Sequence, residues 1–272
     1  RDPGTGPAQV GVDRDRSGRS GPAESDEPDE PDEEPTVATP VRGNATFQSW
    51  TYQPFHPGNN QPVTFLLKAQ ETTPIQQVEL LVYEFELYLD EEFLPSSRRR
   101  AGGEWGLVQT WNFPAGLPQV DLSHFYAAGF PARTQVAFVF RITNTRGEIS
   151  ERMARFDAGT SSWPSDKILL YSTSFQPMRS TVNLCLLPDT DYQNNWSQFL
   201  EDSRRLVFEG YHQSNVIRED KENWAFYYTR QTAHGPTIAQ NFTEPDSYPD
   251  FLRDSIIQGI DAFALLHLNE YS

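Results

Sequence analysis

The stretch "PVTFLLKAQ" (62–70), followed by "IQQVELLVYEFELYL" (75–89), decides the fold class of the first half of this chain. In both stretches apolar residues alternate with polar or charged ones. An alternation of period two is typical of a β-strand with one buried face. We therefore expect one face of these strands to be buried, and its members are Val63, Phe65, Leu67, Ala69, Val78, Leu80, Val82, Phe85, Leu87 and Leu89.

Two further stretches repeat this pattern. They are "WGLVQTWNF" (105–113) and "TQVAFVFRITNTRGEIS" (134–150), and the second closes on an Asn-Thr-Arg-Gly turn. Several short strands at this spacing indicate a β-sandwich accessory domain over residues 44–158. By pattern alone, this segment resembles immunoglobulin-like or fibronectin-type domains, and it carries no diagnostic motif of either.

Residues 1–43 have the composition of a tail. They are rich in Gly and Pro at first and in acidic residues and Pro afterwards, and the first aromatic residue is Phe47. Such a segment buries too little apolar surface to offset its chain entropy, so we expect it to be disordered. It suits an extended spacer between a secretion or anchoring signal and a folded unit. The alternative is an acidic motif that binds a partner or calcium.

The pattern changes after a linker and edge strand expected over 159–180. Apolar runs at 181–187, 224–229 and 261–268 predict strands. Helices are expected between them at 194–211 and 248–260. Asn194 or Asn195 could cap the first helix, and its apolar stripe contains Trp196, Phe199, Leu200, Leu206 and Val207.

Strands that alternate with helices predict parallel βαβ units. We therefore expect residues 181–272 to form an incomplete α/β domain with a mostly parallel sheet. The expected architecture is multidomain: a disordered acidic tail, a β-sandwich, and this partial α/β domain.

Composition excludes several classes of partner. The net charge of −16 and the pI near 4.7 argue against nucleic acid and against anionic membrane surfaces. No apolar run reaches the roughly 18 residues that a membrane-spanning helix needs. The single cysteine, Cys185, excludes an internal disulfide. Because the first residue is Arg1, we expect either a removed leader or a start inside a longer reading frame.

Chemistry is expected beyond the carboxyl ends of the parallel strands, where open α/β sheets bind ligands. In that arrangement the loops after the three strands would bring together Asp189, Asp191, His234 and Glu270.

Metal motifs in the sequence are incomplete. His267 and Glu270 form half of an inverted zinc pattern, but Tyr271 stands where its second histidine is needed. No His-Glu-x-x-His occurs, so His267 is interpreted as an ordinary residue near a strand end. A calcium loop starting at Asp189 would need Gly at 194 and Glu at 200, so a helix-capping turn is expected instead.

Nucleophiles and other motifs are equally sparse. Cys185 is expected in mid-strand, where a buried thiol is inert, and no Gly-x-Ser-x-Gly motif occurs. The run Arg98-Arg99-Arg100 is interpreted as a solvated loop. Three glycosylation sequons, at Asn44, Asn195 and Asn241, are close to the number expected by chance. We therefore assign no catalytic, cofactor-binding or metal-binding residue to this chain.

Residues 166–271 resemble the opening of the catalytic domain in the IgA-peptidase-type zinc metallopeptidases. The resemblance lies in a buried strand followed by a turn, a helix with a Phe-Leu, Asp and Arg-Leu stripe, a strand beginning "NWAFYY" (223–228), and "DAFALLHLNEYS" (261–272). The matching helix residues are Phe199, Leu200, Asp202, Arg205 and Leu206. The turn "PDTDY" departs from the family's Asp-Gly-Tyr; only Asp189 and Tyr192 align with it, in a structural role.

The resemblance implies a secreted zinc metallopeptidase that hydrolyses peptide bonds in proteins, located outside the cell, in the periplasm or at the cell surface. Its zinc histidines would follow on a helix outside this chain, with a glutamate as general base. This chain would supply the sheet and be inactive alone. The alternative is a non-catalytic extracellular or cell-surface binding protein that uses exposed aromatic residues such as Trp105, Trp111 and Trp163. An intracellular α/β enzyme matches the tail poorly.

Overall fold

The structure is a computed structural model, and it describes residues 41–89, 91, 95–99, 103–162, 167–174, 181–211, 223–230 and 259–266. These residues all belong to the second of two compact units, Pro40–Ser272. The tail expected to be disordered lies outside the described residues except for 41–43, and so does nearly all of the helix expected at 248–260.

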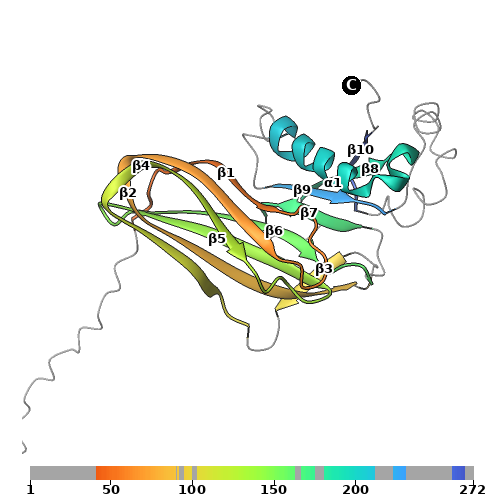
Figure 1. Cartoon of the computed structure of the whole chain (residues 1–272), viewed down its shortest axis with the longest axis horizontal. Coiled ribbons are helices and arrows are strands. Elements are labelled where there is room, and N and C mark those ends of the chain that lie inside the picture. The colour runs from red at the N-terminus through yellow and green to blue at the C-terminus, as the bar shows by residue number, and fades with distance from the viewer. Residues whose placement is uncertain are drawn as a thin grey trace, which may run out of the picture. The chain divides into compact units, whose positions relative to one another are not determined.

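The described residues form ten strands that belong to one sheet (Figure 1). A 3₁₀ turn, η2, one α-helix, α1, and a π-helical turn, η3, lie between the eighth and ninth strands. The bounds are β1 Thr46–Gln53, β2 Val63–Leu89, β3 Pro95–Arg99, β4 Gly106–Tyr126, β5 Thr134–Asn144, β6 Ile149–Ala158, β7 Ile168–Ser172, β8 Val182–Pro188, η2 Thr190–Asn194, α1 Trp196–Arg205, η3 Leu206–Gly210, β9 Trp224–Tyr228 and β10 Ala262–Leu266.

Strand β2 organises the antiparallel part of the sheet. It is 27 residues long and pairs with β4 along one edge and with β1 and then β5 along the other. The pairing shifts between Ile75 and Gln77 on both edges. The buried positions are odd-numbered before this irregularity and even-numbered directly after it, from Val78 to Val82, as Leu67 and Leu80 illustrate. An extra residue at the shift keeps the same face of the strand buried although the parity changes.

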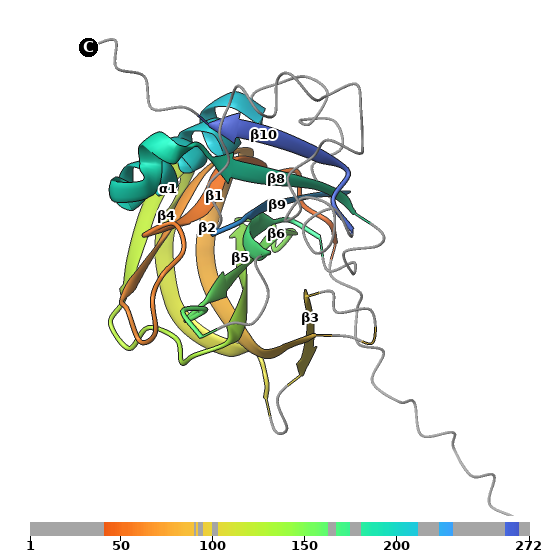
Figure 2. The ribbon, with the colours of Figure 1, turned by 90° about the vertical axis from the view of Figure 1, so that its right-hand side faces the viewer.

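The sheet curls so that β1 lies against β6 and β7. The indole Nε1 of Trp50 donates to the Met153 carbonyl oxygen at 3.0 Å. The Tyr171 hydroxyl donates to the Trp50 carbonyl oxygen at 2.9 Å, and the Tyr52 hydroxyl donates to the Leu170 carbonyl oxygen. These bonds turn the sheet into a half-barrel, whose curvature is visible in Figure 2.

One hydrophobic core fills the curl. It is rich in aromatic rings, and the rings of Tyr52 and Phe156 stack with centroids 3.7 Å apart. Phe65 and Phe138 pack beside them, with their own ring centroids 5.1 Å apart. Aromatic side chains bury about 150–250 Å² each, so they contribute heavily to the stability of the core. The same cluster of buried residues extends from Phe47 to Leu266.

The expected fold class is wrong. The three C-terminal strands are present and the pairs β8–β9 and β8–β10 are parallel. They do not form a separate α/β domain beside a separate β-sandwich, because β7 pairs antiparallel with both β6 and β9. Hydrogen bonding therefore continues from the antiparallel to the parallel strands, in the order β1-β2-β5-β6-β7-β9-β8-β10. The described residues contain a single α-helix.

The stripe expected on that helix is confirmed. Phe199 and Val207 are buried, and Trp196, Leu200 and Leu206 pack against the same core. The Phe199 ring lies 6.0 Å from that of Tyr228, so the helix covers β9. Among the described helices none has the length and apolar character needed to span a bilayer.

Candidate functional site at the carboxyl edge of the parallel strands

The carboxyl ends of β8, β9 and β10 meet at one edge of the sheet. The Asp189 backbone N–H donates to the Leu266 carbonyl oxygen at 3.0 Å, and the Thr229 N–H donates to the Leu186 carbonyl oxygen at 3.4 Å. This edge is where the sequence predicts a convergence of four residues. Asp189 and Asp191 lie there, whereas His234 and Glu270 fall outside the described residues, as do His267 and Tyr271.

The Asp189 carboxylate has a capping role. The side chain is 3% exposed and accepts hydrogen bonds from the backbone N–H and the hydroxyl of Thr190. It is the N-cap of η2, whereas the neighbouring Asp191 is exposed. The capping turn expected here is therefore present as the cap of η2, and both bonds are made by Asp189 Oδ1. Asn195 stands at the N-cap of α1 but makes no side-chain capping bond.

Tyr192 holds the turn to helix α1. Its buried hydroxyl donates to Asp202 Oδ2 at 2.8 Å, and its ring packs on Phe199. Burial first, and then the neighbouring Asp202 carboxylate, raise the pKa of Tyr192 above its ordinary value. The phenol therefore stays protonated and serves as a donor that links η2 to α1.

A polar cluster that the sequence did not reveal lies at the end of β9. The Tyr228 hydroxyl is 3.1 Å from His56 Nδ1, and His56 Nε2 is 2.5 Å from the Thr160 hydroxyl. The Arg230 guanidinium donates to the Thr160 carbonyl oxygen. His56 precedes β2 and Thr160 follows β6, so the cluster ties the antiparallel strands to the parallel ones.

The electrostatics of this cluster keep His56 uncharged. Burial first, and then the positive charge of Arg230, lower the pKa of His56 to about 4. A neutral imidazole has one donor and one acceptor nitrogen, and here both nitrogens face hydroxyl groups. Thr160 is 1% exposed, so its hydroxyl is not accessible as a nucleophile. The cluster therefore links segments of the chain, and its two hydroxyl groups, on Thr160 and Tyr228, are buried.

A second buried network lies farther along the sheet, around Asp157. Gln135 Nε2 donates to Asp157 Oδ1 and the Leu169 N–H donates to Oδ2, both at 3.0 Å. Arg155 Nη1 donates to Gln135 Oε1 at 2.9 Å. Burial raises the pKa of Asp157 to about 6, although the hydrogen bonds oppose this shift. The network fastens β7 to β6 and β5.

The described residues offer no cluster of metal ligands. Within the described ranges, no group of three or more His, Cys, Asp and Glu side chains could hold a metal ion. Cys185 is buried, and burial raises its pKa, so the thiol remains protonated as the sequence predicts. The described part of the chain therefore contains no zinc site.

The aromatic residues considered for a binding surface differ in exposure. Trp105 is 37% exposed and packs on Tyr83. Trp111 is partly buried against the core, and Trp163 falls outside the described residues.

The only signal for the His56 cluster was a histidine in the turn "PFHPG" (54–58), which predicts a turn and says nothing about contact with Tyr228.

Comparisons with known proteins complete the description. No family model and no curated protein matches this chain. Among solved structures it is similar to Spo0M, a sporulation control protein from Bacillus subtilis, at 10% identity and a TM-score of 0.29 over 44% of this chain and 51% of that one. A DUF4466 family protein from Parabacteroides merdae matches at 12% identity and a TM-score of 0.27, over 42% of this chain and 44% of that one.

OgpA from Akkermansia muciniphila, in a catalytically inactive form with an O-glycopeptide substrate, matches at 6% identity and a TM-score of 0.28. The match covers 45% of this chain and 31% of OgpA. The matched regions thus span about half the length of these neighbours or less. At these values the similarity assigns neither a fold nor an activity.

Proposed function

We propose that this chain is part of a secreted zinc metallopeptidase that hydrolyses peptide bonds in proteins. In this proposal, the parallel strands β8, β9 and β10 form the first part of the catalytic sheet, which is continuous with the antiparallel strands. The observation that carries the proposal is the element order from residue 182 to residue 266. A strand, a capped turn, an amphipathic helix and two further strands follow each other, with all three of these strands parallel.

This order supports the proposal because it matches the segment whose sequence resembles the IgA-peptidase-type enzymes. The two positions that align with the family's turn, Asp189 and Tyr192, hold the turn and the helix in place. Ligands of open α/β sheets bind beyond the carboxyl ends of the strands. The edge formed by Asp189, Thr229 and Leu266 is therefore the place where a catalytic centre would be built.

The zinc itself does not fit the residues described here, since no cluster of ligands is found among them. The sequence also contains no His-Glu-x-x-His in any of its residues. The proposal therefore assigns this chain a scaffold role and assigns no chemical step to its side chains. The zinc ligands would come from sequence outside this chain.

The test compares this polypeptide with the product of the complete reading frame that encodes it. Zinc content is measured by mass spectrometry of the metal, and hydrolysis is measured with a fluorescent casein substrate. We expect no stoichiometric zinc and no chelator-sensitive hydrolysis for residues 1–272, and both for the complete product. A complete product without zinc and without hydrolysis would refute the peptidase and favour the binding-protein alternative.

A further inference from the structure

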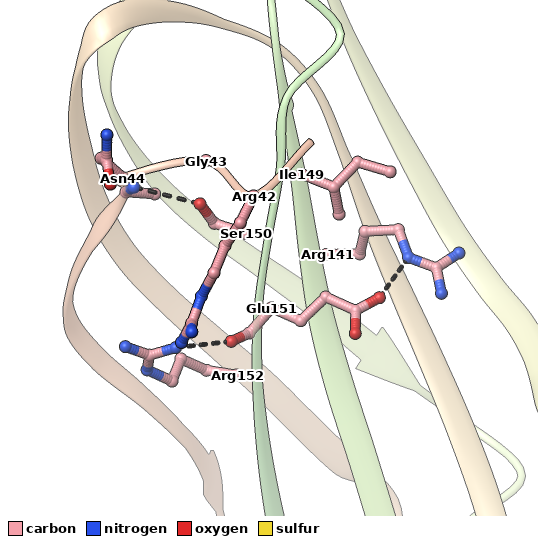
Figure 3. A pocket seen from close by; sticks show the side chains of 9 residues that line it. Arg42, Gly43, Asn44, Arg141, Ile149, Ser150, Glu151 and Arg152 are labelled. Carbon is pink, nitrogen blue, oxygen red and sulfur yellow. Dashed lines mark hydrogen bonds and ion pairs between the residues drawn. The ribbon is translucent and has the colours of Figure 1, made fainter. Parts of the chain in front are cut away.

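A cavity of about 1020 Å³ opens on the antiparallel part of the molecule, and we call it the arginine cavity (Figure 3). The segment before β1 forms one wall, and β5 and β6 form the other. Its charged lining residues are Arg42, Arg141, Glu151 and Arg152. Three guanidinium groups around one cavity are notable in a chain whose net charge is −16.

One of these arginines is neutralised within the protein. Arg141 Nε lies 2.5 Å from Glu151 Oε1, and its Nη1 lies 3.6 Å from Glu79 Oε2. Figure 3 shows the Glu151 carboxylate directed toward Arg141. Glu151 is the only carboxylate among the described lining residues, and its Oε1 is paired with Arg141.

Arg42 and Arg152 have no ion-pair partner among the residues that the structure describes. Among the described carboxylates, none forms an ion pair with either side chain. Figure 3 shows the two side chains pointing toward one another. Two like charges that face each other repel, and an anion placed between two guanidinium groups would form charge-assisted hydrogen bonds with both.

The guanidinium of Arg152 and the backbone at Arg42 are held in place by their surroundings. Arg152 Nη1 donates to the Glu151 carbonyl oxygen at 2.8 Å, and its guanidinium lies 5.3 Å from the centre of the Phe47 ring. The backbone at Arg42 is fixed by a bridge to Ile149, and the Gly43 N–H donates to the Ile149 carbonyl oxygen at 2.7 Å. Holding the donors in place before binding reduces the entropy lost on binding.

Close approach of the two walls depends on Gly43. A Cβ atom at this position would lie 2.7 Å from the Ser150 hydroxyl oxygen, which also accepts a hydrogen bond from the Ala45 N–H at 3.1 Å. The absence of a side chain at residue 43 therefore sets the spacing between Arg42 and β6.

We propose that the arginine cavity is a binding site for a small organic anion, held through its oxyanion groups by Arg42 and Arg152. Carboxylate, phosphate and sulfate share the required chemistry, because each presents at least two oxygens to the planar guanidinium fork. The described lining contains no aromatic side chain, so recognition rests on charge rather than on stacking against a ring. This site is independent of the proposed peptidase function.

The test measures the binding of citrate and of inorganic sulfate to the whole chain by isothermal titration calorimetry in dilute buffer. Citrate probes the carboxylates and sulfate probes the tetrahedral oxyanion. We expect dissociation constants of about 1 mM or tighter at low ionic strength, weakening as sodium chloride is added. Arg42→Gln and Arg152→Gln should each weaken binding about tenfold, since each removes a charge-assisted contact.

The matched control is Arg98→Gln, which also removes one exposed arginine but lies on β3 in an ion pair with Glu86. It should leave the affinity unchanged within about twofold. Binding of citrate alone would identify a carboxylate site, binding of sulfate alone a site for tetrahedral oxyanion groups, and binding of both a general oxyanion site. No saturable binding by the wild-type chain, or binding by Arg42→Gln and Arg152→Gln that is as tight as that of the wild type, would overturn the proposal.

Discussion

His56 and Asp157 respond to acidification in opposite directions. The folded state lowers the pKa of His56 from 6.5 to about 4. Between pH 6.5 and about pH 4, His56 is therefore protonated in the unfolded chain and neutral in the folded chain. Stability from this group is therefore lost as the pH falls from about 6.5 to about 4. The folded state raises the pKa of Asp157 from 3.8 to about 6, so this group adds stability as the pH falls from about 6 to about 4.

Each shift corresponds to about 3 kcal/mol, so in the wild-type chain the two contributions largely cancel between about pH 4 and pH 6. Asp157→Asn should remove the stabilisation that protonation of Asp157 adds as the pH falls. The free energy of unfolding of this variant should then fall by about 2–3 kcal/mol more than that of the wild type on acidification from about pH 6.5 to pH 4. Urea unfolding at a series of pH values gives the two slopes.

The reciprocal variant, His56→Gln, serves as the comparison. It removes the destabilisation due to His56 and keeps the stabilisation due to Asp157. Its free energy of unfolding should therefore rise relative to that of the wild type as the pH falls over the same interval. The slope is the diagnostic quantity, because both variants also change hydrogen bonds that do not depend on pH. Equal slopes for wild type and Asp157→Asn would show that Asp157 does not titrate in this range.

Tyr171 makes a testable contribution to the closure of the sheet. Tyr171→Phe deletes the hydroxyl that donates to the Trp50 carbonyl oxygen inside the core. The loss of one buried hydrogen bond costs about 1 kcal/mol of stability. Denaturant unfolding monitored by tryptophan fluorescence should show this loss. Tyr88→Phe is the control, because its hydroxyl is only partly buried and bonds to Ser96 at 3.3 Å; a loss as large there would argue against a special role for Tyr171.

At the scale of elements, the irregular pairing of β2 lies beside a glycine of β4. Gly116 has φ +70°, and a Cβ atom there would lie 2.5 Å from Cβ of Pro74. Pro74 lies between Gln70 and Ile75, where the pairing of β2 with β4 is irregular. A left-handed backbone and a close neighbour thus both require glycine at residue 116.

Gly116→Ala should therefore destabilise the protein by about 2–3 kcal/mol, combining backbone strain with a steric clash. Gly147→Ala isolates the strain, because Gly147 has φ +77° but no atom within 4 Å of an added Cβ. This control should cost about 1 kcal/mol. Thermal unfolding followed by circular dichroism compares the two variants. Equal losses of stability in the two variants would mean that Pro74 moves aside without a measurable free-energy cost.

At the scale of the molecule, one core joins the antiparallel and parallel strands. β7 is buried along its whole length and pairs with strands of both kinds. The main hydrophobic cluster contains residues of both kinds of strand, and the smaller cluster around Cys185 and Tyr227 lies on β7, β8 and β9 of the same sheet. A protein built in this way is expected to unfold in one cooperative step. Two separate domains would instead unfold independently.

The polypeptide 41–272 should therefore show coincident unfolding transitions by near-ultraviolet and far-ultraviolet circular dichroism. The shorter polypeptide 41–158 should lack a cooperative transition, because it lacks β7. Removing β7 exposes the core around Tyr52 and Phe156 and deletes the bonds that join Trp50 and Tyr52 to this strand. A sharp transition for residues 41–158 would restore the idea of an independent β-sandwich.

Much of the local structure could be predicted from the sequence. Alternation identified the buried face of β2 at Val63, Phe65 and Leu67, and the helical period identified Phe199 and Val207. The turn at Gly147 and the capping role of Asp189 follow from residue types at fixed spacing. These features depend on neighbours a few positions away, so a local pattern is sufficient to reveal them.

The candidate site was predictable only in part. The meeting of the strand ends at Asp189 and Leu266 follows from parallel pairing. The contact of His56 with Tyr228 joins positions 172 residues apart, and the arginine cavity depends on how the segment before β1 crosses β6. No short-range pattern contains such contacts, because they arise only when the sheet curls.

The sequence by itself determined where most strands and the helix lie, which of their faces are buried, and that no complete zinc motif or nucleophile motif is present. The tertiary structure alone decided that β7 connects all strands into one sheet, and that this sheet curls around one core. The physical reason is that a short apolar run such as Ile168–Ser172 has the same pattern at an edge as in the interior of a sheet. Its hydrogen-bonding partners are chosen by residues far away in the chain.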